Sequence, residues 1–171
     1  MSILPHTVAG AVAGSFFDNP ILAGLAGGVS HLVLDAIPHF DPPISKRKAM
    51  PRFIKTLVTL VILVDLLLGL FVLWLLKGHA NLVVGGIIGP AVDLDNFLQY
   101  RFLKGPFPLI SKIGIKIHDE GSNWHHKLQF KSFLVNLILG VILQLAVTLA
   151  GLFYLNYKFN LHLETLMLKF L

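Results

Sequence analysis

Four side chains that can bind a metal ion or carry protons lie within eleven residues of this chain, directly after an apolar, glycine-rich run. They are His31, Asp35, His39 and Asp41. Burying an ionisable group in hydrocarbon costs roughly 2.5–3.5 kcal/mol on insertion scales, so such groups persist mainly where they meet each other, a metal or a proton path. The cluster therefore predicts a functional site.

The spacing within this cluster favours a shared ion. His31 and Asp35 are four residues apart, which places them on one helix face about a turn apart. Both can bind one cation, or the carboxylate can orient a ligating histidine. The alternative is a buried His–Asp hydrogen bond without catalytic function. Pro38 pushes Ile37 toward extended geometry and ends the helix, so His39 is expected to turn back over the helix end as an acid or base.

Other candidates lie far away along the chain. Asp93 and Asp95 follow Pro90, and two acids two residues apart serve one centre only if the helix is distorted there. The alternative for Asp95 is that it caps a new helix. His125 and His126 are adjacent, so only one of the two is expected to ligate the metal. We expect His125 to be the ligand and His126 to act as an acid or base.

A further histidine and the donor chemistry complete the predicted metal site. His6 lies near the start of the first apolar segment, before Thr7 and Gly10, and is expected to be the first ligand of the metal site. The chain has no cysteine, which excludes disulfides and thiolate ligands. Histidine and aspartate ligands without thiolate suit a divalent metal such as Zn²⁺, Mn²⁺ or Fe²⁺. More than four candidate ligands leave room for a two-metal site of the hydrolytic type.

The elements that must position these residues belong to a membrane protein. The 171 residues are 55% hydrophobic and only 13% charged, with a mean hydropathy of +0.76, whereas soluble domains average about 25% charged. We expect an all-α, polytopic fold that forms one membrane domain over residues 1–171, with four or five transmembrane or re-entrant helices. The apolar segments are about 3–17, 21–37, 54–76, 80–98 and 132–155.

The basic residues predict how the chain is oriented. Lysines and arginines concentrate between the second and third segments and between the fourth and fifth, whereas the third and fourth are joined by a turn with only Lys77. The positive-inside rule makes the two basic loops cytoplasmic. It places the predicted ligands at the cytoplasmic side of an inner membrane. The net charge of +5 then reflects contact with membrane lipids and needs no nucleic acid.

Small residues predict which segments pack together. Pairs of glycines four apart allow close approach of helix backbones. They occur in the first, second and fourth segments, at Gly10/Gly14, Gly24/Gly28 and Gly85/Gly89. These are the segments that carry the predicted ligands, whereas the leucine-rich third and fifth segments are expected to face lipid. Asp65 lies in the middle of the third segment and is either a polar contact inside the bundle or part of a proton path.

The motifs resemble those of a known family. The chain contains His6-Thr-Val-Ala-Gly10, Ser30-His31-Leu-Val-Leu-Asp35, Pro90-Ala-Val-Asp93-Leu-Asp95 and the pair His125-His126. This set is similar to that of the bacterial inner-membrane proteins known as membrane-bound metal-dependent hydrolases (the LexA-regulated type). The resemblance covers roughly residues 5–41 and 85–130. It implies that His6, His31, Asp35, Asp93, Asp95 and the histidine pair bind metal.

Two functions follow from the sequence as hypotheses. The first is a metal-dependent hydrolase that cleaves a phosphoester or related bond of a lipid or other amphiphile at the cytoplasmic interface. The rival is a non-enzymatic protein: a small transporter whose ion path includes Asp65, Asp93 and His31, or a degenerate structural relative. The two hypotheses differ in the depth at which the polar groups should lie. A transporter needs them near the middle of the membrane with access from both sides, whereas a hydrolase needs them at one interface.

Overall fold

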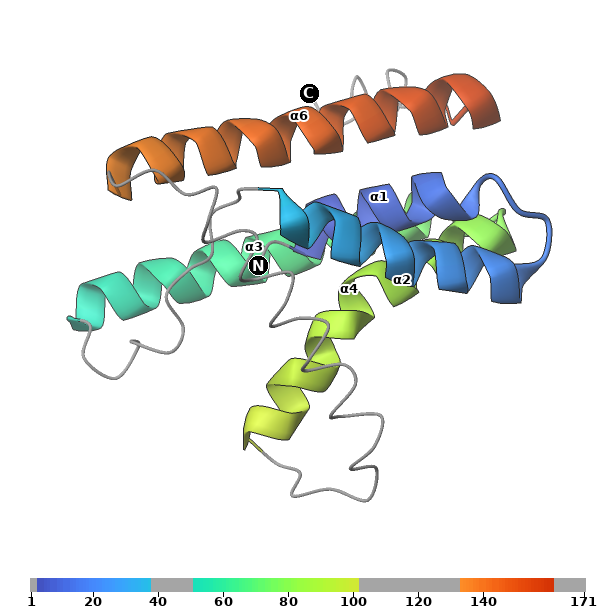
Figure 1. The fold of residues 1–171 in the computed structure, drawn as a ribbon. Helices are drawn as coiled ribbons and strands as arrows, with labels where there is room; N and C mark the ends of the chain where they lie inside the picture. The colour runs from blue at the N-terminus through green and yellow to red at the C-terminus, as the bar shows by residue number, and fades with distance from the viewer. Residues whose placement is uncertain (1–2, 38–50, 102–132, 162–171) are drawn as a thin grey trace.

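The chain folds into helices joined by short turns and longer connections (Figure 1). The computed structural model describes residues 3–37, 51–101 and 133–161, and for residues 93–101, 133, 134, 136 and 137 it describes the backbone alone. Within these ranges there are five helices and no strand, which confirms the all-α prediction. They are α1 (Ile3–Gly14), α2 (Pro20–Ala36), α3 (Arg52–Leu75), α4 (Ala80–Arg101) and α6 (Phe133–Phe159).

Local sequence signals set both ends of α2. Asn19 is the N-cap, and its side chain accepts hydrogen bonds from the backbone N–H groups of Ile21 (2.8 Å) and Leu22 (3.4 Å). Pro20 occupies the first helical position, where its missing N–H costs nothing. At the other end Ile37 is extended, with φ −84° and ψ 134°, as expected for a residue before proline. The predicted end of this helix is confirmed.

The short helix α1 is the centre of the bundle. It packs against each of the other four helices of the described chain, most extensively against α4 and α2. Figure 1 shows α1, α2, α3 and α6 with nearly aligned axes, whereas the later part of α4 turns away from them. The buried apolar residues lie where α1, α3, α4 and α6 meet; they are Val8, Ala11, Val72, Leu76, Leu82 and Leu155.

Glycines bring α1, α2 and α4 into backbone contact. A Cβ added at Gly85 would collide with the carbonyl oxygen of Gly10 and lie 3.1 Å from the Cα of Gly14. A Cβ at Gly27 would collide with the carbonyl oxygen of Gly85. The predicted packing of these three helices is therefore correct. On α2, however, the closest contact is made by Gly27, whereas Gly24 and Gly28 meet side chains of α4.

Charged side chains from the long helices hold both ends of α1. At its start, the carboxylate of Asp65 on α3 accepts hydrogen bonds from the backbone N–H groups of Ile3 and Leu4, the latter at 3.2 Å. Just beyond its end, the Lys158 ammonium on α6 donates to the carbonyl oxygen of Ser15 at 2.8 Å. These contacts match the helix dipole, which favours a negative group at the start and a positive group at the end.

Two helices are long and apolar enough to cross a membrane, judged by length and composition. Within the described residues they are α3, with a mean hydropathy of 2.7, and Ile138–Phe159 of α6, with a mean hydropathy of 2.2. Most of the side chains on both are exposed, including Phe53 and Phe153. The apolar helices α1, α2 and the Ala80–Val92 part of α4 are shorter.

Proline 90 does not interrupt α4. The sequence predicts a segment broken at this residue, but one helix continues from Ala80 to Arg101 with Pro90 inside it. A proline inside a helix removes one backbone hydrogen bond and bends the helix without having to end it. That prediction was wrong, because the helix is continuous through Pro90, although the later part of α4 changes direction in Figure 1.

Replacing Gly85 with alanine should disrupt this packing. The added methyl group would meet backbone atoms of α1, which cannot move aside as a flexible side chain does. We expect Gly85→Ala to lower the free energy of unfolding in detergent by about 2 kcal/mol, a typical cost of overpacking. The control is Gly78→Ala, because a Cβ at Gly78 has no neighbour within 4 Å. Equal stability of the two variants would contradict the proposed contact.

Candidate metal centre

Two of the predicted ligands share one face of α2, near its end. His31 and Asp35 are one turn apart, and His31 Nε2 lies 3.0 Å from Asp35 Oδ2. Both side chains are buried, since His31 is 0% and Asp35 5% exposed. The same stripe of α2 carries Gly24 and Gly27, which are also buried. The residues that bring α2 close to α4 therefore also turn His31 and Asp35 into the bundle.

The third ligand comes from α1. His6 is 4% exposed, and its Nε2 atom lies 3.6 Å from Asp35 Oδ1. The rings of His6 and His31 are tilted by 35° with their centroids 4.3 Å apart. Gly89 of α4 packs against the backbone of His6, because a Cβ there would collide with the His6 carbonyl oxygen. Three helices thus fix the position of His6.

The three side chains form a group that could hold one metal ion. His6, His31 and Asp35 each offer one donor atom, and these atoms all lie within 4.8 Å of one another. Ligands about 2.1 Å from a common ion are at most about 4.2 Å apart, so small side-chain rotations suffice. Two imidazoles and a carboxylate are the donors of many catalytic zinc and non-haem iron sites, which keep further positions open for water or substrate.

A simple stabilising pair explains only part of this geometry. The sequence alternative, a buried His–Asp hydrogen bond, accounts for His31 and Asp35 alone. Here a second imidazole approaches the other oxygen of the same carboxylate, in a site closed to solvent. Each further buried polar ring adds a desolvation cost. A shared cation would offset that cost for all three groups at once.

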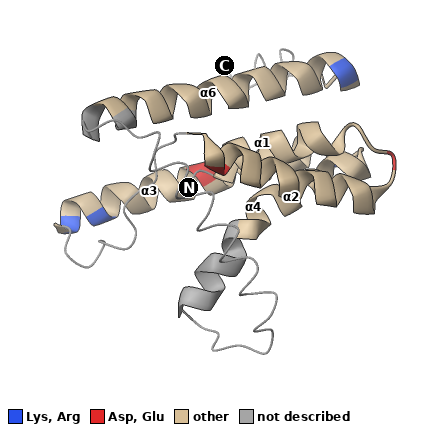
Figure 2. Ribbon diagram, viewed as in Figure 1, with Lys and Arg blue, Asp and Glu red and all other residues tan. Residues whose placement is uncertain are grey.

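Figure 2 shows where the acidic residues of the described chain gather: at the junction of α1, α2 and α3, and in the turn between α1 and α2. Asp35 on α2 and Asp65 on α3 both contact the first turn of α1, at His6 and at the backbone of Leu4. The sequence left the partner of Asp65 open. In the structure, its partners are the backbone N–H groups of Ile3 and Leu4 at the start of α1.

The remaining predicted residues are not placed relative to this centre. Asp93 and Asp95 lie on the helical backbone of α4, in the part whose side chains are outside the description. His39, His125 and His126 lie outside the described residues. Their predicted roles as further ligands or as acid and base therefore stay predictions. Of the six residues predicted to bind metal, the described side chains bring together His6, His31 and Asp35.

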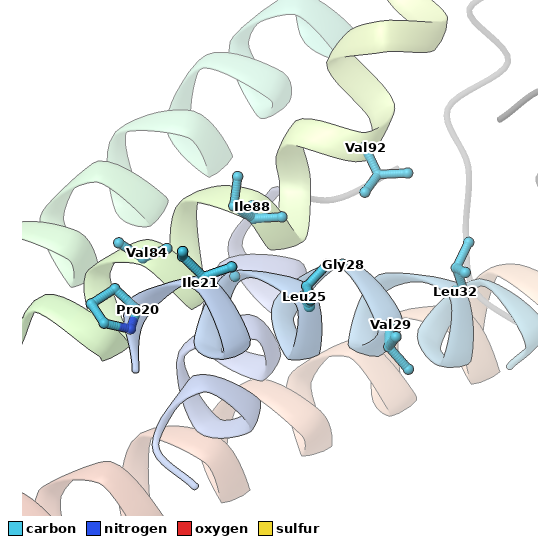
Figure 3. Close-up of a pocket in the computed structure, with 10 residues that line it drawn as sticks. Pro20, Ile21, Leu25, Gly28, Val29, Leu32, Val84, Ile88 and Val92 are labelled. Atoms are coloured by element: carbon cyan, nitrogen blue, oxygen red, sulfur yellow. The ribbon is translucent and has the colours of Figure 1, made fainter. Parts of the chain in front are cut away.

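An apolar groove runs along the outside of α2, where it faces α4 (Figure 3). Its volume is about 520 Å³, and no charged residue lines it. It extends from Pro20 to Leu32, a length of about 18 Å at the rise of an α-helix. Figure 3 shows α4 diverging from α2 beyond Ile88, with Leu32 on α2 and Val92 on α4 lining this end of the groove. Leu32 directly follows the candidate ligand His31 in the chain.

Comparisons with known proteins do not identify this chain. No protein-family model, no curated protein and no solved structure matches it. The resemblance to the membrane-bound metal-dependent hydrolases therefore stays a prediction from the motifs, and the argument for function depends on the geometry of the site.

Zinc should stabilise the protein through these three residues. A ligand at 100 times its dissociation constant stabilises a folded protein by about 2.7 kcal/mol. We expect Zn²⁺ to raise the unfolding temperature of the wild-type protein in detergent, and the increase to disappear in Asp35→Ala. The comparison is between the increases in unfolding temperature that zinc causes in each protein, so a lower unfolding temperature of the zinc-free variant does not affect the result. Asp18→Ala, which removes an exposed acid in the α1–α2 turn, should respond like the wild type.

Proposed function

We propose that this protein is a membrane-embedded, metal-dependent hydrolase that acts on a lipid or other amphiphile. The single observation that supports it is the buried group of His6, His31 and Asp35, brought from two helices to within 4.8 Å. Three protein ligands that leave positions open are typical of catalytic metal sites, whereas structural sites are closed by four.

The membrane part of the proposal rests on the two long helices. α3 has 24 residues, about 36 Å, which exceeds the ~30 Å hydrocarbon core of a bilayer. One end carries Arg52 and Lys55. The other carries Lys77, whose ammonium lies 4.8 Å from the centroid of the Trp74 ring. Charges beside aromatic rings are typical of the membrane interface. We propose that α3 and α6 cross an inner membrane, and that the end with Arg52 is cytoplasmic.

The depth of the site follows from Asp65. This residue lies near the middle of α3 and touches the start of α1. Asp65 would lie about 20 Å from Arg52, measured along α3. His6 and its partners on α2 would lie about one turn beyond this point, because Thr7 packs beside Gly69. This is deeper than the cytoplasmic interface expected from the sequence.

In this proposal α1 and α2 form a hairpin whose turn lies toward the Lys77 end of α3, where Asn81 donates to the carbonyl oxygen of Phe17. The metal centre at the open end of the hairpin then lies near the middle of the bilayer and is reached from the cytoplasmic side.

The chain's own residues would prepare the reaction. A divalent metal would polarise a phosphoryl or acyl oxygen and lower the pKa of a water molecule. His6, His31 and Asp35 would hold it in a site that excludes bulk water, where charges interact strongly. In the hydrolysis, the oxygen of water bonds to the reacting phosphorus or carbon, the bond to the leaving oxygen breaks, and that oxygen takes up a proton.

The groove along α2 indicates the class of substrate. Its length of about 18 Å is close to half the ~30 Å hydrocarbon core, which is the distance spanned by one acyl chain. Its lining carries no charged side chain, and Leu32 at one end of it directly follows His31 in the chain. We therefore propose that the groove holds an acyl chain of the amphiphile.

The depth also favours a second candidate, a divalent-cation transporter. Transporter sites lie near the bilayer midplane, where short helices end. α1 begins beside Asp65, and the last turn of α2 carries Asp35, which lies beside His6 of α1. Against an ion path through Asp65 stands its contact with α1, because a carboxylate that accepts two backbone N–H bonds already has a structural role. A measurement of both activities separates the two candidates.

The hydrolase should act on lipid esters in reconstituted vesicles. We expect metal-loaded wild-type protein to release product from phospholipid, and His31→Ala to be at least about 100-fold slower because the metal is lost. His79→Ala is the matched control, since the His79 ring packs against Phe159, tilted by 56° and with the ring centroids 4.8 Å apart, away from the metal centre.

The same vesicles can carry a metal-sensitive dye inside. If metal enters the vesicles only when His31 is present and no product is released, the result would support the transporter function and contradict the hydrolase function. Absence of both activities from metal-loaded protein, over a panel of phosphoester and carboxylic-ester lipids, would overturn the proposed function.

A bulky side chain in the groove should exclude an acyl chain without affecting metal binding. Val29 lines the groove and Val33, one turn further along α2, does not, yet both are 59% exposed. We expect Val29→Trp to reduce photo-crosslinking to a diazirine-bearing acyl chain of a phospholipid at least fivefold, and Val33→Trp to leave it unchanged. Equal labelling of the two variants would remove the acyl-chain assignment. Crosslinks between two copies of the chain at Val29 would replace it with self-association.

A further inference from the structure

The start of α1 is an unusual place for a helix end. Ile3 and Thr7 pack beside Gly69 of α3, and Thr7 and Val8 are fully buried. The first N–H groups of any α-helix have no partner within the helix. In an apolar environment each such group costs free energy until it finds an acceptor. A helix that begins inside a bundle therefore needs an acceptor supplied by a neighbour.

Asp65 supplies this acceptor from α3. Its Oδ2 atom accepts from the N–H of Ile3, and its Oδ1 atom accepts from the N–H of Leu4 at 3.2 Å. The two oxygens of one carboxylate thus hold two successive N–H groups. This contact prevents the first turn of α1 from sliding along the helix axis and from rotating about it.

The same contact determines where His6 lies. His6 is three residues after Ile3, in the first turn of α1, and it is the only member of the metal group on this helix. His31 and Asp35 both belong to α2, and their spacing of four residues sets their mutual geometry. A shift of α1 therefore moves His6 away from the other two ligands without disturbing the pair.

We propose that Asp65 is a positioning residue for the metal centre: by anchoring the start of α1, it holds His6 in place as the third ligand. This inference rests on the proposed function for the identity of the ligand, but the anchoring itself does not need a metal. Glycine packing alone would be the competing explanation, since Gly89 also contacts the backbone of His6.

The experiment compares Asp65→Leu, which removes the acceptor, with Asp65→Asn, which keeps one acceptor oxygen. The probe is Co²⁺, whose absorption spectrum reports on its ligands. We expect Asp65→Leu to weaken Co²⁺ binding at least tenfold and to give the spectrum of His6→Ala, and Asp65→Asn to restore most of the affinity. In a His6→Ala background, Asp65→Leu should have no further effect, as required if it acts through His6.

A second readout works on metal-free protein. Ethoxycarbonylation of histidines by diethyl pyrocarbonate, followed by mass spectrometry, should modify His6 in Asp65→Leu at least fivefold more than in the wild type or Asp65→Asn. His31 should stay protected in all three, and Asp18→Leu is the control for loss of an acid.

The outcomes separate the two proposals. Unchanged protection of His6 in Asp65→Leu would overturn the positioning role, whatever the metal result. Absence of Co²⁺ binding by the wild type, with His6 exposed only in Asp65→Leu, would overturn the metal centre and keep the anchor.

Discussion

The structure depends on the close approach of three helix backbones. Gly10 of α1, Gly27 of α2 and Gly85 of α4 meet where any side chain would collide with a carbonyl oxygen. Small residues at such a contact let the helix backbones approach closely, and van der Waals contact between them then holds the three helices together. This contact brings α1 and α2 near enough for the rings of His6 and His31 to lie 4.3 Å apart.

The polar groups of the bundle follow from that constraint. Because α1 has only 12 residues, about 18 Å, and packs against the other four described helices, both of its ends need polar partners within the bundle. Asp65 and Lys158 provide them from the two long helices. The long helices thereby contribute charge to the centre of the protein although most of their surface is exposed and apolar. The group of His6, His31 and Asp35 then lies where the anchored start of α1 meets the end of α2.

Much of this could be predicted from local patterns. The residue before Pro38 and the spacing of His31 and Asp35 are local properties of one helix, and the structure has both as expected. The convergence of His6 was predicted because several separate motifs pointed to a common site. The glycine spacing correctly predicted which helices pack, and only the choice of Gly27 on α2 was missed.

Other features have no sequence signature of their own. The partner of Asp65 is a pair of backbone N–H groups, which every residue except proline carries, so no motif could reveal it. Lys158 lies among aromatic residues near the end of α6, a weak signal of a long side chain that reaches toward a polar partner. The path of α4 through Pro90 depends on tertiary packing that compensates the lost hydrogen bond.

The central claim is that His6, His31 and Asp35 bind one ion together. X-ray absorption of the zinc-loaded, detergent-purified protein tests it most directly. We expect a first shell that contains two imidazole nitrogens at about 2.0–2.1 Å and a carboxylate oxygen at about 2.0–2.2 Å, with one imidazole lost in His6→Ala. A wild-type protein that retains no zinc, or a shell that is the same in His6→Ala, would contradict the account.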